Sequence, residues 1–233
     1  MLICRRHYNF AQKTKDMKKT IKNIVFDMGG VLVDIDRMAC VREFKKLGFK
    51  DIEDFIGDFK QKDIFLALEE GNATKMDFYN FIRNNFLPQC SDNEIKKAWL
   101  AFLITISDYK LRQILRLKTN YRIYLLSNTN PIHFEWVRCS FFEKEGKKLE
   151  DFFDFCFLSY ELKITKPNEE IFSFMIEKTN INPQETLFIE DGLANIETAS
   201  KLGFLCYQPT TNTTLEEFFE KDLEKFVDEI KTF

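Results

Sequence analysis

The stretch FDMGGVL (Phe26–Leu32) begins at the last residue of the short β-rich run IKNIVF (Ile21–Phe26), and the sequence changes character at Asp27. A β-rich run that stops at an acid, and then at Gly29-Gly30, predicts a buried strand that ends in a glycine-containing loop. The stretch therefore places one carboxylate at the carboxyl end of the first predicted strand.

Downstream of this stretch, strand-like and helix-like segments alternate. Further strands are predicted at Tyr121–Leu126, Asp154–Leu158, Thr186–Ile189 and Phe204–Tyr207. Helices are predicted at Pro167–Thr179, Leu193–Leu202 and Leu215–Ile230. This alternation predicts an α/β fold, a doubly wound, Rossmann-like parallel sheet with helices on both faces.

The segment after the first strand has helical periods and little strand signal. Thr74–Asp77 and Ser91–Glu94 are typical helix starts, because each has a hydroxyl cap and an acid three residues later. We expect a small α-helical cap domain at residues 34–112, inserted into a core made of residues 17–33 and 113–233. Residues 1–16 are expected to be a disordered extension, since Met17 begins a stretch typical of a natural start.

Composition excludes several classes of protein. The 233 residues carry a formal net charge of −3, which argues against binding to nucleic acid or to an anionic membrane surface. No apolar run approaches the roughly 20 residues that a membrane span needs. The six cysteines are scattered without a CxxC pair, which argues against a zinc site and favours reduced thiols in the cytoplasm. The sequence leaves the oligomeric state open.

The residues that follow the predicted strands are the candidates for chemistry, because ligands of open parallel sheets bind beyond the carboxyl ends of the strands. They are Asp27, Ser127-Asn128 and Glu190-Asp191, with Lys166 leading into a helix. Clustered carboxylates repel one another, and oxygen ligands suit Mg²⁺. A phosphoryl group is the anion that suits Mg²⁺, a lysine and a carboxylate nucleophile together, so a small phosphorylated metabolite is the expected partner.

Four motifs in order carry a resemblance to a known family. They are FDMGGVL (Phe26–Leu32), LLSN (Leu125–Asn128), TKP (Thr165–Pro167) and FIEDGLAN (Phe188–Asn195). The set resembles the haloacid dehalogenase superfamily of hydrolases, in the branch with a small helical cap. Within that branch it is most similar to phosphatases that act on α-D-glucose 1-phosphate. The resemblance implies a Mg²⁺-dependent phosphomonoester hydrolase that acts on a small sugar phosphate.

The resemblance also implies a role for each motif residue. Asp27 is the implied nucleophile, which forms an aspartyl-phosphate, and Lys166 neutralises the charge of Asp27 and of the phosphate. The implied phosphate-binding groups are the Ser127 hydroxyl and the Asn128 amide, beside Lys166. The implied metal ligands are Asp27, the Gly29 carbonyl, Glu190 and Asp191, with Asn195 orienting this motif.

Gly29 departs from the usual phosphatase pattern, in which a second Asp stands two residues after the nucleophile and protonates the leaving group. General acid catalysis is worth about a factor of 10²–10⁴, so this loss matters. An anomeric leaving group needs less protonation, and Asp34 and Asp36 are the nearest other acids in the sequence. Two alternatives therefore stay open, a dehalogenase that uses a carboxylate nucleophile without Mg²⁺ and a weakly catalytic phosphometabolite-binding protein.

Overall fold

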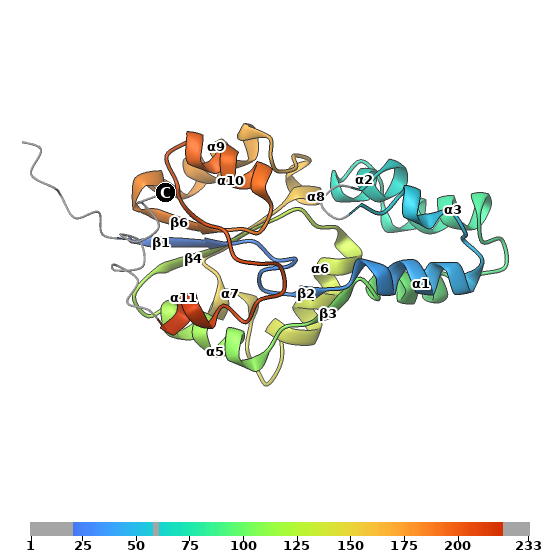
Figure 1. The fold of residues 1–233 in the computed structure, drawn as a ribbon, viewed down its shortest axis with the longest axis horizontal. Coiled ribbons are helices and arrows are strands. Elements are labelled where there is room, and N and C mark those ends of the chain that lie inside the picture. The colour runs from blue at the N-terminus through green and yellow to red at the C-terminus, as the bar shows by residue number, and fades with distance from the viewer. Residues whose placement is uncertain (1–20, 58–60, 221–233) are drawn as a thin grey trace, which may run out of the picture.

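A five-stranded parallel sheet forms the centre of the computed structural model, which describes residues 21–57 and 61–220 (Figure 1). The strand order is β5-β4-β1-β6-β7, and each of the four pairings is parallel. The strands are β1 (Asn23–Phe26), β4 (Arg122–Ser127), β5 (Phe155–Leu158), β6 (Thr186–Ile189) and β7 (Leu205–Tyr207). The strand that precedes Asp27 is thus the central strand of the sheet.

Helices cover both faces of this sheet, and the side chains of each strand divide between two hydrophobic clusters. In β1, Ile24 and Phe26 belong to one cluster and Val25 to the other. The first cluster contains residues of α5 (Asp108–Leu117), α6 (Pro131–Val137), α7 (Leu149–Phe152) and α11 (Glu216–Glu220). The second contains residues of α9 (Glu169–Thr179) and α10 (Leu193–Lys201). The predicted doubly wound α/β fold is confirmed.

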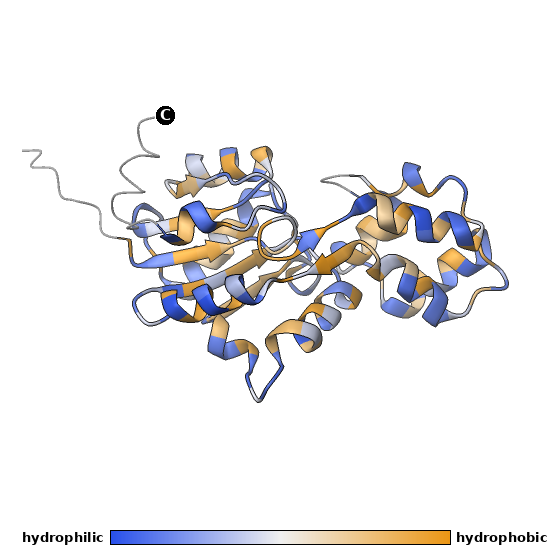
Figure 2. Ribbon diagram, turned by 60° about the horizontal axis from the view of Figure 1, so that its bottom comes forward, coloured by the Kyte–Doolittle hydropathy of each residue, from blue (hydrophilic) through white to orange (hydrophobic). Residues whose placement is uncertain are grey.

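Figure 2 shows the strands of the sheet in hydrophobic colours, whereas the surrounding helices carry both hydrophobic and hydrophilic residues. Strands covered on both faces need apolar side chains on both faces, which explains why the predicted strands are nearly continuous apolar runs. Among the described helices, none is long and apolar enough to cross a membrane.

A group of helices extends beyond one end of the sheet (Figure 1). It contains α1 (Arg37–Leu47), η1 (Ile52–Asp54), α2 (Asp63–Glu69), α3 (Lys75–Asn85) and α4 (Asp92–Leu100). Both predicted capping boxes are present, at Thr74 of α3 and at Ser91 of α4. Aromatic side chains fill the space between these helices, with Phe65 in edge-on contact with both Phe78 and Trp99. Such pairs add stabilisation beyond the area that they bury.

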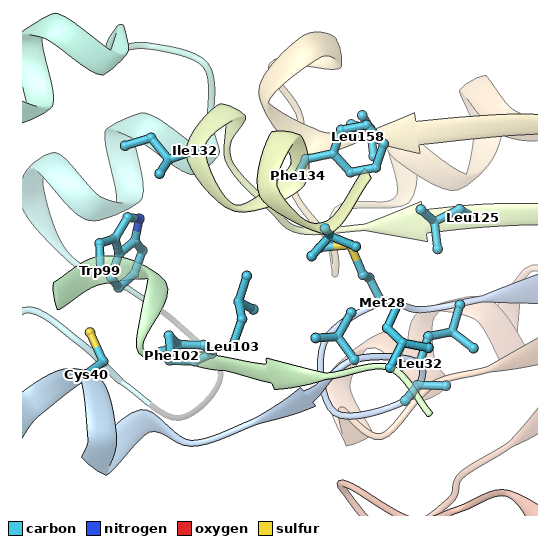
Figure 3. Packing of buried hydrophobic residues seen from close by; sticks show 14 of the residues in the cluster. Met28, Leu32, Cys40, Trp99, Phe102, Leu103, Leu125, Ile132, Phe134 and Leu158 are labelled. Carbon is cyan, nitrogen blue, oxygen red and sulfur yellow. The ribbon is translucent and has the colours of Figure 1, made fainter. Parts of the chain in front are cut away.

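The hydrophobic core continues without a break from the sheet into this group of helices. Figure 3 shows Trp99, Phe102 and Leu103 on one side and Met28 and Leu32, from the loop after β1, on the other. All five residues belong to the first hydrophobic cluster and are at most 8% exposed. The helical group is therefore packed against the loop that follows the central strand.

An antiparallel pair of short strands, β2 (Asp34–Ile35) and β3 (Leu103–Thr105), leads into and out of the helical group. The sequence carries little strand signal here, because two and three residues are too few to show alternation. The proposed cap boundary at residue 112 falls inside α5, whose Lys110 contacts the loop after β1. The division into a core of 17–33 and 113–233 and a cap of 34–112 stays a prediction.

Several predicted element bounds need correction. The helix predicted from Pro167 begins at Glu169, because the Asn168 side chain accepts a hydrogen bond from the Glu170 amide and caps the helix there. Of the predicted helix Leu215–Ile230, the structure describes Glu216–Glu220. Leu215 precedes the observed helix, while residues 221–230 of the prediction and the extension predicted at residues 1–16 lie outside the described residues. Five helical segments were not predicted: α6 (Pro131–Val137), η2 (Arg138–Phe142), α7 (Leu149–Phe152), α8 (Ser159–Leu162) and η3 (Pro183–Glu185).

Candidate functional site

The carboxylate of Asp27 stands at the end of β1, where the chain turns into a tight loop. The Asp27 amide donates to the Ile189 carbonyl of β6 at 2.9 Å, which continues the sheet ladder by one residue. The Leu32 and Val33 amides then both donate to the Met28 carbonyl, at 2.9 and 2.8 Å. Gly30 has a φ of +78°, and a Cβ there would overlap the Asp191 carboxylate. The loop is thus closed tightly enough to require glycine beside the acids.

The ammonium of Lys166 joins the acids at the ends of two strands. Its Nζ donates to Asp27 Oδ1 at 2.6 Å, to Glu190 Oε2 at 2.5 Å and to the Leu126 carbonyl at 2.9 Å. All three donors of the ammonium are used, and Lys166 is only 4% exposed. The side chain is therefore fixed between Asp27 and Glu190.

Asn128 fixes the backbone of Lys166. Its Nδ2 donates to the Lys166 carbonyl at 2.8 Å, and its Oδ1 accepts from the Lys166 amide at 2.8 Å. The predicted phosphate-binding residue Asn128 therefore uses its side chain to position Lys166. Ser127 is fully buried, and its hydroxyl makes a long 3.4 Å hydrogen bond to the Asn128 carbonyl.

Three carboxylates gather around this lysine. One oxygen from each of Asp27, Glu190 and Asp191 lies within 4.8 Å of the other two. Glu190 is oriented by the Gly192 amide at 2.9 Å, and Asp191 by the Thr211 hydroxyl at 2.7 Å. Three acids and one lysine leave two negative charges uncompensated when all are ionised. A hard divalent cation with oxygen ligands, such as Mg²⁺, fits this donor set and its charge.

Burial and crowding shift the pKa values of these groups. Burial and the charge of Glu190 raise the pKa of Asp27 to about 8, against the opposing effect of Lys166. Burial also raises the pKa of Asp191. Burial alone would lower the pKa of Lys166, but Asp27 and Glu190 outweigh it and raise that pKa. A bound cation favours the ionised carboxylates, so it would oppose the shifts at Asp27 and Asp191.

A cavity of about 960 Å³ opens at these strand ends and is shared with the helical group. Its floor contains Asp27, Gly29, Asn128, Lys166, Glu190, Asp191 and Asn195. Its helical side contributes Arg37, Gln61, Glu69, Glu70 and Trp99. The structure thus brings most of the residues predicted from the sequence to one cavity, while Ser127 is fully buried and is not part of the lining. A ligand held there would contact both the sheet and the helices.

The two acids considered as replacements for the missing catalytic Asp are engaged elsewhere. Asp34 Oδ1 accepts from the buried Lys110 ammonium at 3.0 Å. Asp36 caps α1 by accepting from the Ala39 amide at 2.8 Å, and this hydrogen bond keeps its pKa below the ordinary value. Neither belongs to the lining of the cavity. Both were reasonable candidates from their position in the sequence, and the structure turns both away from the site.

A family model for haloacid dehalogenase-like hydrolases matches residues 21–203, which is well over half of the chain. The chain belongs to this family.

Several relatives of this hydrolase align with it over most of its length. A protein of Bacteroides thetaiotaomicron named D-ribitol-5-phosphate phosphatase is 44% identical over 81% of this chain and 92% of its own. The structure of a haloacid dehalogenase family enzyme of the same species was solved with magnesium and inorganic phosphate. Its sequence is 42% identical to this chain, and its fold matches with a TM-score of 0.80 over 85% of this chain and 99% of that enzyme's chain. The structure of a predicted hydrolase of the family from Porphyromonas gingivalis is 37% identical in sequence and matches with a TM-score of 0.79, over 86% of this chain and 97% of that protein's chain.

Sequence reasoning missed one buried residue of this hydrolase that supports the site. Lys110 is 1% exposed, and its ammonium donates to the Val31 carbonyl at 2.8 Å and the Leu32 carbonyl at 3.3 Å. It therefore holds the loop that follows Asp27. The available signal was helical spacing, because Lys110 stands four residues before the buried Ile114 and so shares its face of α5.

His133, in α6 after the second motif, both packs in the core and reaches the cavity. It lines the cavity, yet its ring stacks on Trp99 with the centroids 4.3 Å apart, and its Nε2 lies 3.1 Å from the Trp99 carbonyl. A carbonyl only accepts, so Nε2 carries the proton and donates it. Burial lowers the pKa of His133 to about 4, so the ring is neutral at neutral pH.

Proposed function

We propose that this chain is a Mg²⁺-dependent phosphomonoester hydrolase that acts through an aspartyl-phosphate on Asp27. The observation that carries the proposal is the cluster of three carboxylates within 4.8 Å of one another, joined by the Lys166 ammonium. The buried Lys166 ammonium compensates part of the carboxylate charge beside Asp27. This arrangement suits attack by a carboxylate on a phosphoryl group whose charge needs compensation.

Each residue of the cluster has a role in this proposal. An Asp27 oxygen attacks phosphorus, and the Lys166 ammonium stabilises the charge that Asp27 shares with the phosphoryl oxygens. Glu190, Asp191, the second Asp27 oxygen and the Gly29 carbonyl hold Mg²⁺, which when bound neutralises charge on the phosphoryl oxygens. Water then hydrolyses the aspartyl-phosphate and restores Asp27. The phosphoryl oxygens are received by the Ser127–Asn128 segment.

The proposed substrate is a small sugar or sugar-alcohol phosphate. The support is the relative named D-ribitol-5-phosphate phosphatase, at 44% identity, and a cavity of about 960 Å³ whose helical side presents Arg37 and Gln61. Such polar groups suit a hydroxylated chain. The leaving group of a 5-phosphate is a primary alkoxide, which is more basic than the anomeric oxygen that the glucose 1-phosphate resemblance suggested. The need for a proton donor is then greater.

The protein is further proposed to work in the cytoplasm on a free metabolite. The five cysteines of the described residues are all unpaired, which agrees with a reducing compartment. The net charge of −3 gives no electrostatic reason to expect nucleic acid as a partner. In this proposal the helical segment serves as a cap over the cavity.

The test compares hydrolysis of p-nitrophenyl phosphate and D-ribitol 5-phosphate by the wild type and by Asp27→Asn, with Mg²⁺ and with chelator. We expect activity that needs both Asp27 and Mg²⁺, and a loss of more than about a hundredfold in Asp27→Asn. Release of halide from a 2-haloacid in chelator would instead support the dehalogenase alternative. Binding of the phosphate esters without any turnover would support the phosphometabolite-binding protein.

A further inference from the structure

One carboxyl group that lines the cavity comes from the helical segment, and the proposed mechanism assigns this carboxyl group no role. Glu69, the last residue of α2, lines the cavity together with Asp27 and Lys166. Gly29 supplies no acid at the position where phosphatases of this kind usually carry one. We propose that Glu69 donates the proton to the oxygen that leaves phosphorus. This inference rests on the phosphatase function proposed above.

Glu69 is held beside the segment that follows the second motif. The Ser159 hydroxyl donates to the Glu69 carbonyl at 2.7 Å and accepts from the Thr129 amide at 3.0 Å. Thr129 follows Ser127 and Asn128 directly and also lines the cavity. A single fully buried hydroxyl therefore bridges the end of α2 and the loop proposed to receive the phosphoryl oxygens.

A close backbone contact fixes the same turn. Gly71, two residues after Glu69, has a φ of +64°, and a Cβ there would overlap the Tyr160 carbonyl. Any side chain at this position would collide with the neighbouring backbone, so the contact requires glycine. The Ser159 bridge and the Gly71 contact together dock the Glu69 backbone on the core.

The remaining acids that line the cavity are committed elsewhere. The carboxyl groups among its described lining residues belong to Asp27, Glu69, Glu70, Glu190 and Asp191. Three of these form the cation-binding cluster. Glu70 Oε2 accepts from Asn72 Nδ2 at 3.2 Å.

His133 is the other proton-bearing candidate in the lining, but its N–H is directed at the Trp99 carbonyl. Elimination therefore leaves Glu69. Within the described part of the chain, no hydrogen-bond donor or cation pairs with the Glu69 carboxyl group. Burial, with a contribution from Glu70, raises the pKa of Glu69 to about 8. An acid with this pKa is protonated at neutral pH and can donate.

The proton transfer completes the proposed reaction. As the bond between Asp27 and phosphorus forms, the ester P–O bond breaks and its electron pair moves to the departing oxygen. That oxygen takes the proton of Glu69 and leaves as an alcohol. Water then attacks the aspartyl-phosphate, gives one proton to the Glu69 carboxylate and releases Asp27. The net change is ester plus water to alcohol plus phosphate, with Asp27 and Glu69 restored.

The test measures alcohol release in a single turnover with Mg²⁺, so that hydrolysis of the aspartyl-phosphate does not enter the rate. Glu69→Gln keeps the shape of the side chain and removes its acidic proton. With D-ribitol 5-phosphate, whose leaving group is a primary alkoxide, we expect Glu69→Gln to lower the rate by about 10²–10⁴. With p-nitrophenyl phosphate, whose leaving group needs no proton, we expect a loss of less than about tenfold.

Glu177→Gln is the matched control, because Glu177 is an exposed carboxyl group of α9 that lies outside the cavity lining. It should leave both rates within about threefold of wild type, and thermal unfolding checks the fold of both variants. Equal losses on both esters in Glu69→Gln, or no loss on either, would overturn the assignment of the proton donor. A wild-type protein that hydrolyses neither ester refutes the phosphatase function itself, and the inference falls with it.

Discussion

Replacing Lys166 by methionine tests the electrostatic centre of the site. The variant keeps the length of the side chain and removes one buried positive charge, which contacts Asp27 at 2.6 Å and Glu190 at 2.5 Å. At an effective dielectric constant of about 20, each contact is worth roughly 6 kcal/mol before desolvation. Removing one partner of a buried ion pair costs about 3–5 kcal/mol, because the other partner is left buried and charged.

We therefore expect Lys166→Met to lower the free energy of unfolding by about 3–5 kcal/mol in chelator at pH 8. For a chain of this size the midpoint of thermal unfolding should fall by roughly 6–20 °C. Lys22→Met is the matched control, since Lys22 contacts Glu185 at a similar 2.9 Å but its side chain is 62% exposed. That variant should lose less than about 1 kcal/mol.

The pH dependence of this loss gives a second signature. Asp27 has a raised pKa of about 8 against an ordinary 3.8, so at intermediate pH the folded protein holds a proton that the unfolded chain releases. Without Lys166 the pKa of Asp27 lies higher still, so the loss should shrink as the pH falls towards about 8 and change little below it, where the folded form of both proteins holds the Asp27 proton. Urea unfolding at several pH values measures it. A loss equal to that of Lys22→Met, or one that grows on acidification, would refute the electrostatic reasoning.

Three further predictions follow from separate features. Asp191→Ala should weaken Mg²⁺ binding, measured by calorimetry, and excess Mg²⁺ should restore part of the activity; full activity of the wild type in chelator would contradict a metal role. His133 has a pKa of about 4 in the folded protein and 6.5 in the unfolded chain, so the free energy of unfolding of the wild type should fall by up to about 3 kcal/mol as the pH falls from 6.5 to 4. In His133→Gln, urea unfolding should show a smaller dependence of this free energy on pH. Gly71→Ala should destabilise by more than Gly146→Ala, because both have positive φ but only Gly71 meets a neighbouring backbone, and equal thermal midpoints would show that the docking contact contributes nothing.

The parallel sheet and the convergence of acids could be predicted because both depend on local signals. Apolar runs that end at an acid or at Ser-Asn mark strand ends, and the carboxyl ends of parallel strands share one edge. Asp27, Lys166, Glu190 and Asp191 consequently meet as expected. The chemical roles of these residues came from the family resemblance, because the periodicity of apolar residues carries no information about chemistry.

The features that could not be predicted depend on contacts between distant segments. The bridge from Ser159 to Glu69 joins residues 90 positions apart, and nothing near either residue marks it. The same holds for Lys110, whose buried ammonium contacts a loop 78 and 79 residues earlier. Asp34 and Asp36 were nearest to the nucleophile in sequence, but an ion pair and a helix cap direct them away from it. Proximity along the chain is a poor guide to direction in space.

The position of β1 in the sheet has a consequence for how the chain is made. This strand lies at the centre, between β4 and β6, yet it is synthesised first, and its neighbours are separated from it by about 100 and 160 residues. On the ribosome, the edge of β1 that pairs with β4 stays unpaired until β4 has emerged, and the other edge stays unpaired until β6 has emerged, while the helical group can already form its own local contacts. An apolar strand with two open edges invites pairing with other chains. Asp27 and Glu190 come together only after β6 has paired with β1, so the nascent protein cannot bind its cation before that pairing.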